Sequence, residues 1–130
     1  MTIAEASRKY GISADTLRYY ERVGIIPRVP RTKSGIRDYD EASCGWIELT
    51  KCLRSAGVQI EALIQYSALF QRGEETVGER KALLEEQRRQ LLERREDIQR
   101  SLDRLTKKIE SYDKLLLEKE RQIRAAGGDV

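Results

Sequence analysis

The sequence contains no histidine and only two cysteines, Cys44 and Cys52, which limits the covalent chemistry that its side chains can perform. Without histidine, Ser-His-Asp and Cys-His catalysis and zinc sites of the HExxH or Cys₂His₂ type are excluded. Cys52 follows Lys51 and precedes Arg54, and positive charge close to a thiol favours the nucleophilic thiolate. A thiolate at this position could add to an electrophilic carbonyl, or be oxidised or nitrosated. The alternative for Cys52, and our interpretation of Cys44, is a small hydrophobic side chain in a helix.

No cofactor and no metal site are expected, because two cysteines cannot form a Cys₄ zinc site within one chain or a disulfide scaffold. The N-terminal segment has no apolar signal-peptide region, and no stretch reaches 18 apolar residues, so no membrane segment is expected. These observations predict a cytoplasmic protein that is not an enzyme.

The 130 residues carry 25 basic and 22 acidic side chains, a net charge of only +3, but the charge is unevenly distributed. Residues 1–37 hold eight basic and three acidic residues, a net +5, whereas the remainder carries −2. Charged residues make up 36% of the chain and aromatic residues 6%, which is unusual for a single compact domain. The composition therefore predicts a basic head that binds a polyanion, most simply nucleic acid, attached to a long charged helix.

Two short helices are predicted at the N-terminus, from Thr2 to Tyr10 and from Ser13 onward. Thr2 and Ser13 are residue types that cap helix N-termini, and Gly11 and Gly24 are suited to the left-handed conformation that ends helices. A pair of short helices joined by a glycine-containing turn is typical of a helix-turn-helix.

A β-hairpin "wing" and two further helices are predicted next. Residues 27–31 and 36–39 are expected to pair across a turn at Ser34-Gly35. Helices are then expected over residues 40–55, with Asp40 as the N-cap, and over residues 59–71, followed by a hinge at residues 72–76. The apolar stripe predicted for the first of these helices consists of Trp46, Leu49 and Leu53.

The last third of the sequence predicts one long helix. Residues 78–124 lack proline and glycine apart from Gly78, and apolar residues recur at alternating spacings of four and three, which is the pattern of a coiled coil. The expected domains are a DNA-binding head with its linking helix pair at residues 1–73, a dimerisation helix at 74–124 and a flexible tail at 125–130. The seam predicted for dimerisation is Leu84, Leu91, Ile98, Leu102, Leu105, Ile109, Tyr112 and Leu116.

The run SADTLRYYERVG at residues 13–24, followed by Arg37-Asp38-Tyr39, closely resembles the MerR family of bacterial transcription regulators. The resemblance implies an all-α fold with a small β-hairpin wing: a winged helix-turn-helix head and a long dimerisation helix that forms an antiparallel coiled coil. It also implies a homodimer that binds a palindromic promoter and, when signalled, distorts the DNA for RNA polymerase at the same promoter.

The expected DNA-binding residues lie on the second helix and the wing. Arg18 is suited to a phosphate or a guanine edge, and Tyr19 offers a hydroxyl, whereas Tyr20 is interpreted as core. By resemblance, Arg37 and Tyr39 are expected to contact phosphate at the wing base. The complete predicted set is Ser13, Thr16, Arg18, Tyr19, Arg22, Arg31, Lys33, Ser34, Arg37 and Tyr39.

The sequence says less about which effector such a regulator would sense than about its DNA binding. The chain resembles the subgroup of MerR-like regulators that respond to reactive aldehydes and nitrosative stress through a single cysteine, which would be Cys52, tuned by Lys51 and Arg54. Metal-sensing and drug-sensing relatives carry further cysteines or an additional domain. The alternatives are a non-covalent small molecule bound near Tyr66 and Phe70, or a DNA-architectural protein with no effector. The sequence leaves open whether Cys52 or Cys44 reacts and whether the protein represses or activates.

Overall fold

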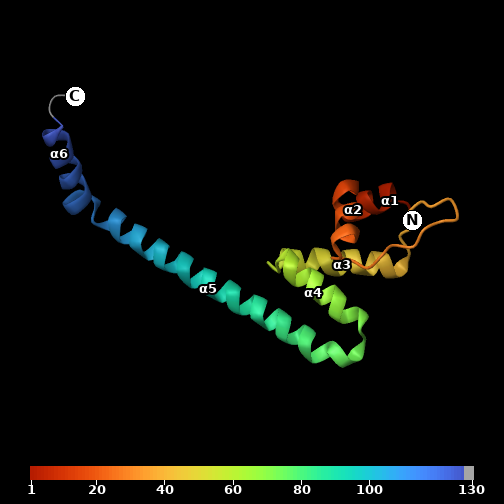
Figure 1. Cartoon of the computed structure of the whole chain (residues 1–130). Helices are drawn as coiled ribbons and strands as arrows, with labels where there is room; N and C mark the ends of the chain where they lie inside the picture. Colours follow the sequence, from red (N-terminus) through yellow and green to blue (C-terminus); the bar gives the residue numbers. More distant parts are fainter. Residues whose placement is uncertain (128–130) are drawn as a thin grey trace. The chain divides into compact units, whose positions relative to one another are not determined.

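The computed structural model describes residues 1–127, and within that range the fold is all-α (Figure 1). The chain divides into two compact units, a head unit (Met1–Arg89) and a second unit (Gln90–Val130). In chain order, the elements are α1 (Ile3–Tyr10), α2 (Ala14–Val23), α3 (Glu41–Ser55), α4 (Ile60–Gln71), a 3₁₀ turn (Glu74–Thr76), α5 (Val77–Glu110), a π-helical turn (Tyr112–Leu116) and α6 (Leu117–Ala126).

The predicted helix-turn-helix is confirmed, together with the caps that set its boundaries. The Thr2 side chain accepts a hydrogen bond from the Glu5 backbone N–H at 3.1 Å, and the Glu5 carboxylate accepts one from the Thr2 N–H, which completes a capping box. Ser13 caps α2 in the same way. Gly11 and Gly24 follow the two helices with φ values of 66° and 88°, where any larger residue would be strained.

The predicted β-hairpin wing is wrong in form, because residues 27–39, here called the wing loop, contain no strand. A single antiparallel bridge joins Arg31 to Arg37, and the Thr32 N–H donates to the Ile36 carbonyl at 2.8 Å to close the turn. The two prolines of the segment cannot donate backbone hydrogen bonds, so the ladder has too few donors to extend. The wing is therefore an extended loop closed at its tip.

The apolar stripe predicted for α3 is only partly buried, although Trp46 and Leu53 pack against the head core. Asp40 caps its N-terminus as expected, accepting from the Ser43 N–H at 2.8 Å. The fully buried positions are Ile47 and Thr50, however, while the predicted stripe of Trp46, Leu49 and Leu53 is only half-buried. The Trp46 ring contacts Phe70 edge-on, with ring centroids 4.8 Å apart, so it covers the seam between α3 and α4.

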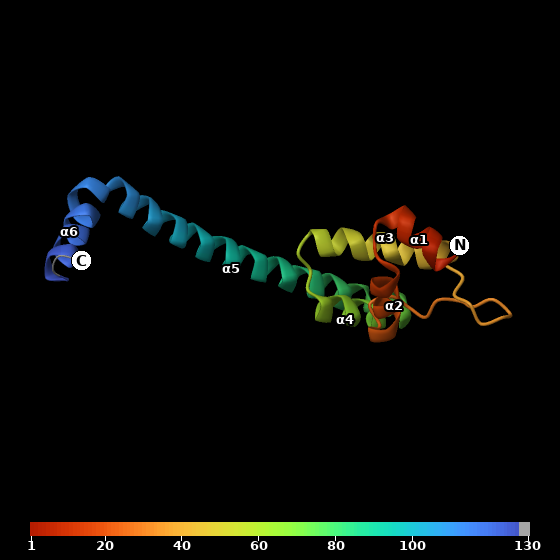
Figure 2. The same cartoon turned by 90° about the horizontal axis from the view of Figure 1, so that it is seen from above.

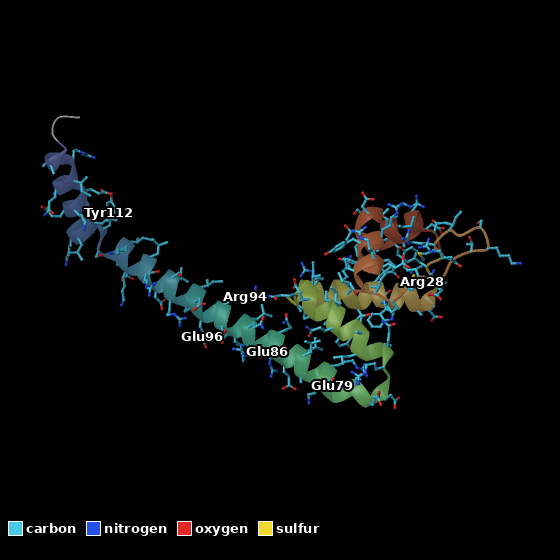
Figure 3. All side chains as sticks on the ribbon, in the orientation of Figure 1. Arg28, Glu79, Glu86, Arg94, Glu96 and Tyr112 are labelled. Atoms are coloured by element: carbon cyan, nitrogen blue, oxygen red, sulfur yellow. The ribbon has the colours of Figure 1, made fainter. Side chains whose placement is uncertain are left out.

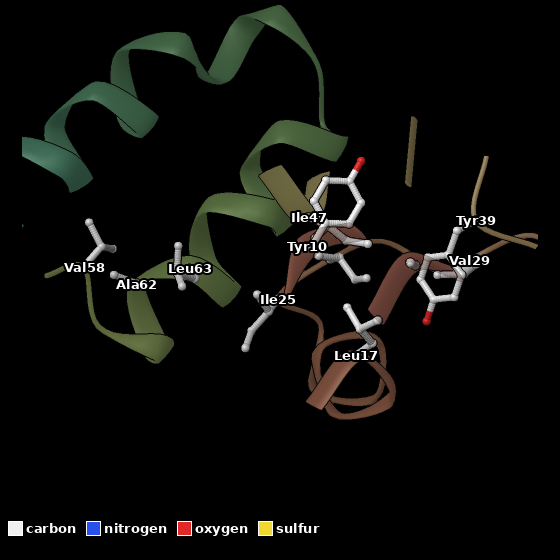
Figure 4. Close-up of a cluster of buried hydrophobic side chains, with 11 residues drawn as sticks. Tyr10, Leu17, Ile25, Val29, Tyr39, Ile47, Val58, Ala62 and Leu63 are labelled. Carbon is white, nitrogen blue, oxygen red and sulfur yellow. The ribbon is translucent and has the colours of Figure 1, made fainter. Parts of the chain in front are cut away.

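The head unit has one continuous hydrophobic core. Its fully buried side chains come from every segment between α1 and α4, including the wing loop (Figure 4). Because the loop contributes Val29 and Tyr39 to this core, its two ends are held against the helices. The core residues are Ala6, Tyr10, Leu17, Ile25, Ile26, Val29, Tyr39, Ile47, Val58, Ala62 and Leu63.

The first turns of α5 belong to the head unit, so the head extends beyond the predicted boundary at residue 73. Leu83 and Leu84 pack against the head core, and the Gln87 side chain is buried and accepts a hydrogen bond from the Gln59 N–H at 3.0 Å. Leu84, predicted as part of the dimerisation seam, is therefore engaged within its own chain.

The long helix is interrupted at Ser111, contrary to the prediction of one helix to residue 124. The Ser111 hydroxyl and N–H both donate to the Lys107 carbonyl, at 2.8 and 3.0 Å. A serine that bonds back to the preceding turn in this way competes with the helical ladder and bends helices. The π-helical turn follows, and α6 leaves in a new direction (Figure 2).

The predicted flexible tail at residues 125–130 is corrected in its first part. Ala125 and Ala126 are the last residues of α6. Residues 128–130 lie outside the described part of the chain, so the rest of that prediction stays a prediction.

In the second unit, none of the side chains described between residues 90 and 127 is buried. Ile98, Leu102, Leu105 and Ile109 are 54–67% exposed and follow one another at heptad spacing along α5. Charged side chains such as Glu86, Arg94 and Glu96 project from the same helix (Figure 3). The coiled-coil prediction is based on this apolar stripe, which is exposed to solvent in the structure.

Candidate nucleic-acid interface

The exposed face of α2 carries the first group of predicted DNA-binding residues. The Ser13 hydroxyl is occupied as a cap, because it accepts from the Thr16 N–H at 3.1 Å and donates to the Thr16 hydroxyl at 2.8 Å. Arg18 is exposed and pairs with Asp15 one helical turn earlier, with 2.8 Å between the charged atoms. An exposed pair of this kind is weak, so Arg18 is free to exchange Asp15 for a phosphate or base edge.

Tyr19 and Tyr20 share the boundary between core and solvent, rather than dividing into one exposed and one core residue. Both are half-buried and pack against the head core, with ring centroids 6.5 Å apart. The Arg22 guanidinium lies 5.5 Å from the centre of the Tyr19 ring, a cation–π arrangement. Stacking therefore restricts Arg22 and keeps its charge beside α2.

Glu21 joins α2 to the wing loop. Its carboxylate accepts hydrogen bonds from the Val29 N–H at 2.8 Å and from the Arg37 Nε at 2.6 Å, and Arg31 lies 3.8 Å away. The side chain of Glu21 is only 8% exposed. Burial alone would raise the pKa of Glu21, but the hydrogen bonds from Arg37 and Val29 and the charges of Arg37 and Arg31 outweigh it and lower that pKa.

Around Glu21, five arginines gather on one surface. A cavity of about 470 Å³ lies between α2 and the wing loop. The excess of positive charge in residues 1–37 does not by itself predict where this cavity lies. Arginine side chains are suited to phosphate because each presents several N–H donors in a plane. The residues lining the cavity are Arg18, Glu21, Arg22, Arg28, Arg31 and Arg37.

Two members of this cavity were absent from the predicted site. Arg28, marked on the head in Figure 3, was counted only as part of the basic charge, and Glu21 only as one of the acidic residues. A signal for Arg28 was present in the sequence: Val29 is apolar in a polar stretch, so it faces the core and its neighbour Arg28 faces outward. Glu21 had no comparable signal, because its partners are eight and sixteen residues away.

The tip of the wing loop presents the remaining polar candidates. Arg31 donates to the Gly35 carbonyl at 3.3 Å, and the hydroxyls of Thr32 and Ser34 lie 3.0 Å apart. Gly35 has a φ of 85° and allows the sharp turn at the tip. Lys33 is exposed beside it, so the tip carries an accessible positive charge.

Tyr39 does not face outward as a phosphate ligand would. It is 1% exposed, and its hydroxyl oxygen is enclosed without a hydrogen-bond partner (Figure 4). Burial raises the pKa of Tyr39. The Met1 ammonium donates to the Tyr39 carbonyl at 2.8 Å and to the Asp38 carboxylate at 3.0 Å, which pins this end of the loop. The role of Tyr39 in this arrangement is to anchor the loop in the core, so its predicted phosphate contact is corrected.

Cys52 lies on the exposed side of α3, whereas Cys44 is half-buried with its thiol 3.9 Å from the Tyr39 carbonyl. The two cations predicted to tune Cys52 are engaged elsewhere. Lys51 donates to the Tyr10 carbonyl at the end of α1, at 2.7 Å, and Arg54 donates to the Val58 carbonyl at 2.9 Å. The expectation that Lys51 and Arg54 act on the Cys52 thiol is therefore not supported by their hydrogen bonds.

Comparison with known proteins decides the family to which this arrangement of helix-turn-helix and wing belongs. The family model described as "MerR HTH family regulatory protein" matches residues 1–68, which is more than half of the chain. The chain belongs to the MerR family. Members of this family are transcription regulators rather than enzymes, so the expectation that the chain is not an enzyme is confirmed.

Among MerR-family relatives, the chain is 55% identical to the HTH-type transcriptional regulator AdhR of Bacillus subtilis over 93 residues. That alignment spans 72% of this chain and 66% of the length of AdhR.

Two solved structures of MerR family regulators are similar over nearly the whole chain. One, from Listeria monocytogenes, is 45% identical, with a TM-score of 0.73, and the match covers 98% of this chain and 96% of the other. The second, HiNmlR, is described as a regulator that lacks the sensor domain and is bound to promoter DNA. It is 33% identical, with a TM-score of 0.66, and the match covers 87% of this chain and 90% of HiNmlR.

Within residues 1–127, no cluster of three or more acidic, cysteine or histidine side chains could hold a metal ion. None of the helices in this range is both long and apolar enough to cross a membrane.

Proposed function

We propose that this MerR-family protein binds promoter DNA through α2 and the wing loop and regulates transcription in the bacterial cytoplasm. The observation that carries the proposal is the gathering of five arginines from these two elements around one cavity on the head unit. Phosphate contacts from such a surface fix the orientation of a protein on the duplex, while the exposed residues of α2 can reach base edges. HiNmlR, which is bound to promoter DNA in its structure, supports this assignment.

The active species in this proposal is a homodimer. The apolar stripe of Ile98, Leu102, Leu105 and Ile109 is too exposed to be stable in water without a cover, and a second copy offers an identical stripe. The family resemblance favours antiparallel pairing of these helices. A dimer would place two heads on the two halves of a palindromic promoter, where bending or untwisting of the DNA would act on RNA polymerase at the same promoter.

We propose further that Cys52 receives the signal. Its thiol is exposed on α3, within the head unit, and the similarity to HiNmlR, a regulator described as lacking the sensor domain, favours a sensor within the head unit. With an aldehyde, the thiolate sulfur forms a bond to the carbonyl carbon, and the π electrons of the carbonyl move to its oxygen, which takes up a proton from water. The product is a hemithioacetal on Cys52.

The two cysteines allow a matched test. Cys52→Ala should leave DNA binding unchanged and abolish induction of a reporter gene by formaldehyde or methylglyoxal, whereas Cys44→Ala should retain induction. Mass spectrometry of the intact protein should show the hemithioacetal mass on the wild type and on Cys44→Ala, but not on Cys52→Ala. Undiminished induction in Cys52→Ala would exclude this thiol as the sensor, and loss in Cys44→Ala alone would transfer the role to Cys44.

A second candidate trigger is a non-covalent small molecule. The observation in its favour is a cavity of about 220 Å³ between α4 and the first turns of α5, lined by Tyr66, Val77, Arg80, Lys81 and Leu84. Arg80 is held there by the Thr76 hydroxyl at 3.2 Å and lies 5.1 Å from the Phe70 ring centre. Aromatic and cationic groups together suit an amphipathic anion. If this cavity is the sensor, Tyr66→Ala will lose induction while Cys52→Ala keeps it.

DNA footprinting separates regulation from a purely architectural role without an effector. A regulator should protect one palindromic segment between promoter elements, and its affinity should fall steeply as salt rises, because several phosphates are contacted. Uniform protection along the duplex would favour the architectural alternative. An affinity insensitive to salt would contradict DNA binding by the arginine-lined surface.

A further inference from the structure

Glu21 holds a position that the DNA-binding proposal does not explain. It stands among five arginines, yet its side chain is only 8% exposed and its carboxylate accepts a hydrogen bond from the Arg37 Nε at 2.6 Å. The same carboxylate accepts the Val29 N–H at 2.8 Å, so it binds both the backbone and a side chain of the wing loop. A negative group in a phosphate-binding surface weakens general DNA affinity, and its presence therefore needs another function.

We infer that Glu21 is a positioning residue that fixes the wing loop at one distance from α2 and thereby determines how well the head discriminates its own operator from other DNA. This inference rests on the proposed DNA binding. In this proposal Glu21 does not contact DNA. It acts through Arg37, Arg31 and the backbone of Val29.

Recognition of a DNA sequence depends on the distance between α2 and the wing loop. α2 reaches base edges while the wing arginines reach the sugar-phosphate backbone, so a sequence is recognised only when both contacts form at the same time. The core anchors the wing loop at Val29 and Tyr39, but between these anchors the loop has a single bridge in place of a hairpin ladder. A short, charge-assisted bond from α2 to Arg37 adds a restraint between the anchors. If the restraint is removed, the arginines can follow any phosphate, and the loss falls on discrimination rather than on general affinity.

Asp15 provides a matched control on the same helix. It also pairs with an arginine, Arg18, at 2.8 Å, but the Asp15 side chain is 97% exposed and touches no part of the wing loop. Glu21→Gln and Asp15→Asn therefore each remove one negative charge from α2, next to an arginine of the same cavity. Only the first removes the link to the wing loop.

The experiment uses the full chain and two DNA probes of equal length. The specific probe is a duplex that the wild-type protein selects from a random library, and the second is a shuffled duplex of the same composition. Discrimination is the ratio of the two dissociation constants at fixed salt. Glu21→Gln should lower this ratio at least about tenfold, the value of one charge-assisted hydrogen bond, while binding to the shuffled duplex stays equal or tightens. Asp15→Asn should change the ratio less than about fivefold.

Each of the following outcomes would overturn the inference. Equal ratios for Glu21→Gln and Asp15→Asn would mean that Glu21 contributes charge alone. Equal weakening on both probes would mean a structural role only. If Glu21→Gln does not fold, Glu21→Asp decides, because it keeps the charge but withdraws the carboxylate by one methylene, and full discrimination in that variant would also overturn the inference. If the wild-type protein selects no sequence at all, the proposed function fails, and the inference fails with it.

Discussion

The head unit and the second unit of this protein bury their apolar side chains in different ways. In the head unit, eleven apolar side chains from α1 to α4 and the wing loop form one core. In the second unit, Ile98, Leu102, Leu105 and Ile109 are all more than half exposed, although they follow a regular heptad pattern. The same residue types therefore stabilise the first unit within one chain and leave the second with an uncovered stripe.

This difference implies two kinds of stability. The core of the head unit is complete within one chain, so its unfolding should not depend on protein concentration. A helix surface that is stabilised by a second copy should instead become more stable as concentration rises, because association shifts the folding equilibrium. The predictions below test that contrast, beginning with the change expected to have the largest effect.

The largest effect is expected from polar substitutions in the exposed stripe. Leu102→Gln combined with Leu105→Gln removes four apolar side chains per dimer, which should cost the dimer at least about 5 kcal/mol, since each buried leucine contributes roughly 2 to 5 kcal/mol. Sedimentation equilibrium should show monomers where the wild type is dimeric. Binding to a palindromic duplex should weaken with it, because each monomer holds only one head.

Arg104→Gln combined with Lys107→Gln is the matched control, since both side chains are exposed on the same helix but lie outside the seam. This variant should remain dimeric. If the control dissociates as readily as the leucine variant, or if the wild type is a monomer, the contrast between the two units is wrong.

The next effect concerns the core of the head unit. Ile47 is 0% exposed, and Ile47→Ala should destabilise the head by about 3 kcal/mol through lost transfer energy and a residual cavity. Thermal unfolding followed by circular dichroism should show a lower Tm whose decrease is the same at every protein concentration. Ile36→Ala is the control, because Ile36 is 59% exposed at the tip of the wing loop and should lose less than about 0.5 kcal/mol.

An intermediate effect is expected from pH. Because the pKa of Glu21 is lower in the folded head than in the unfolded chain, its ion pair contributes stability above the unfolded value of about 4.3, and that stability is lost as pH falls through the folded value. Glu21→Gln should cost about 2 kcal/mol at pH 7. The difference between the wild type and this variant should shrink in melts recorded toward pH 3, and a constant difference would refute the role of the charge.

The smallest effect is expected at a helix cap. Thr2→Ala removes the side chain that accepts from the Glu5 N–H and should destabilise the head by about 1 kcal/mol. Gln59 also stands at an N-cap, that of α4, but its side chain makes no capping hydrogen bond. Gln59→Ala should therefore change the free energy of unfolding, measured in urea, by less than half as much as Thr2→Ala does.

Local signals in the sequence predicted the helices of the head well. Thr2, Ser13 and Asp40 cap the helices that they were expected to cap, and Gly11 and Gly24 follow the first two helices in the left-handed conformation. Such features depend on a few consecutive residues, so no knowledge of distant contacts is needed to find them. The arginines of α2 and the wing loop were likewise visible as a charge excess in the first 37 residues.

Other features depended on contacts that the sequence pattern does not specify. The break occurs at Ser111, whose hydroxyl donates back to the Lys107 carbonyl, a bond that the heptad pattern does not predict. The buried face of α3 is centred on Ile47 because of how that helix packs in the head core, although several stripes were available to it. Leu84 fits the seam by spacing but is taken by the head core.

The sequence by itself determined the caps, the segregation of positive charge and the heptad stripe, because each is a property of residues that are close along the chain. Only the tertiary structure decided that Tyr39 is buried and anchors the wing loop, that Lys51 and Arg54 donate to backbone carbonyls, and that Glu21 joins α2 to Arg37. These last arrangements pair groups from different elements, and their geometry is set by the packing of the shared core rather than by spacing in the sequence.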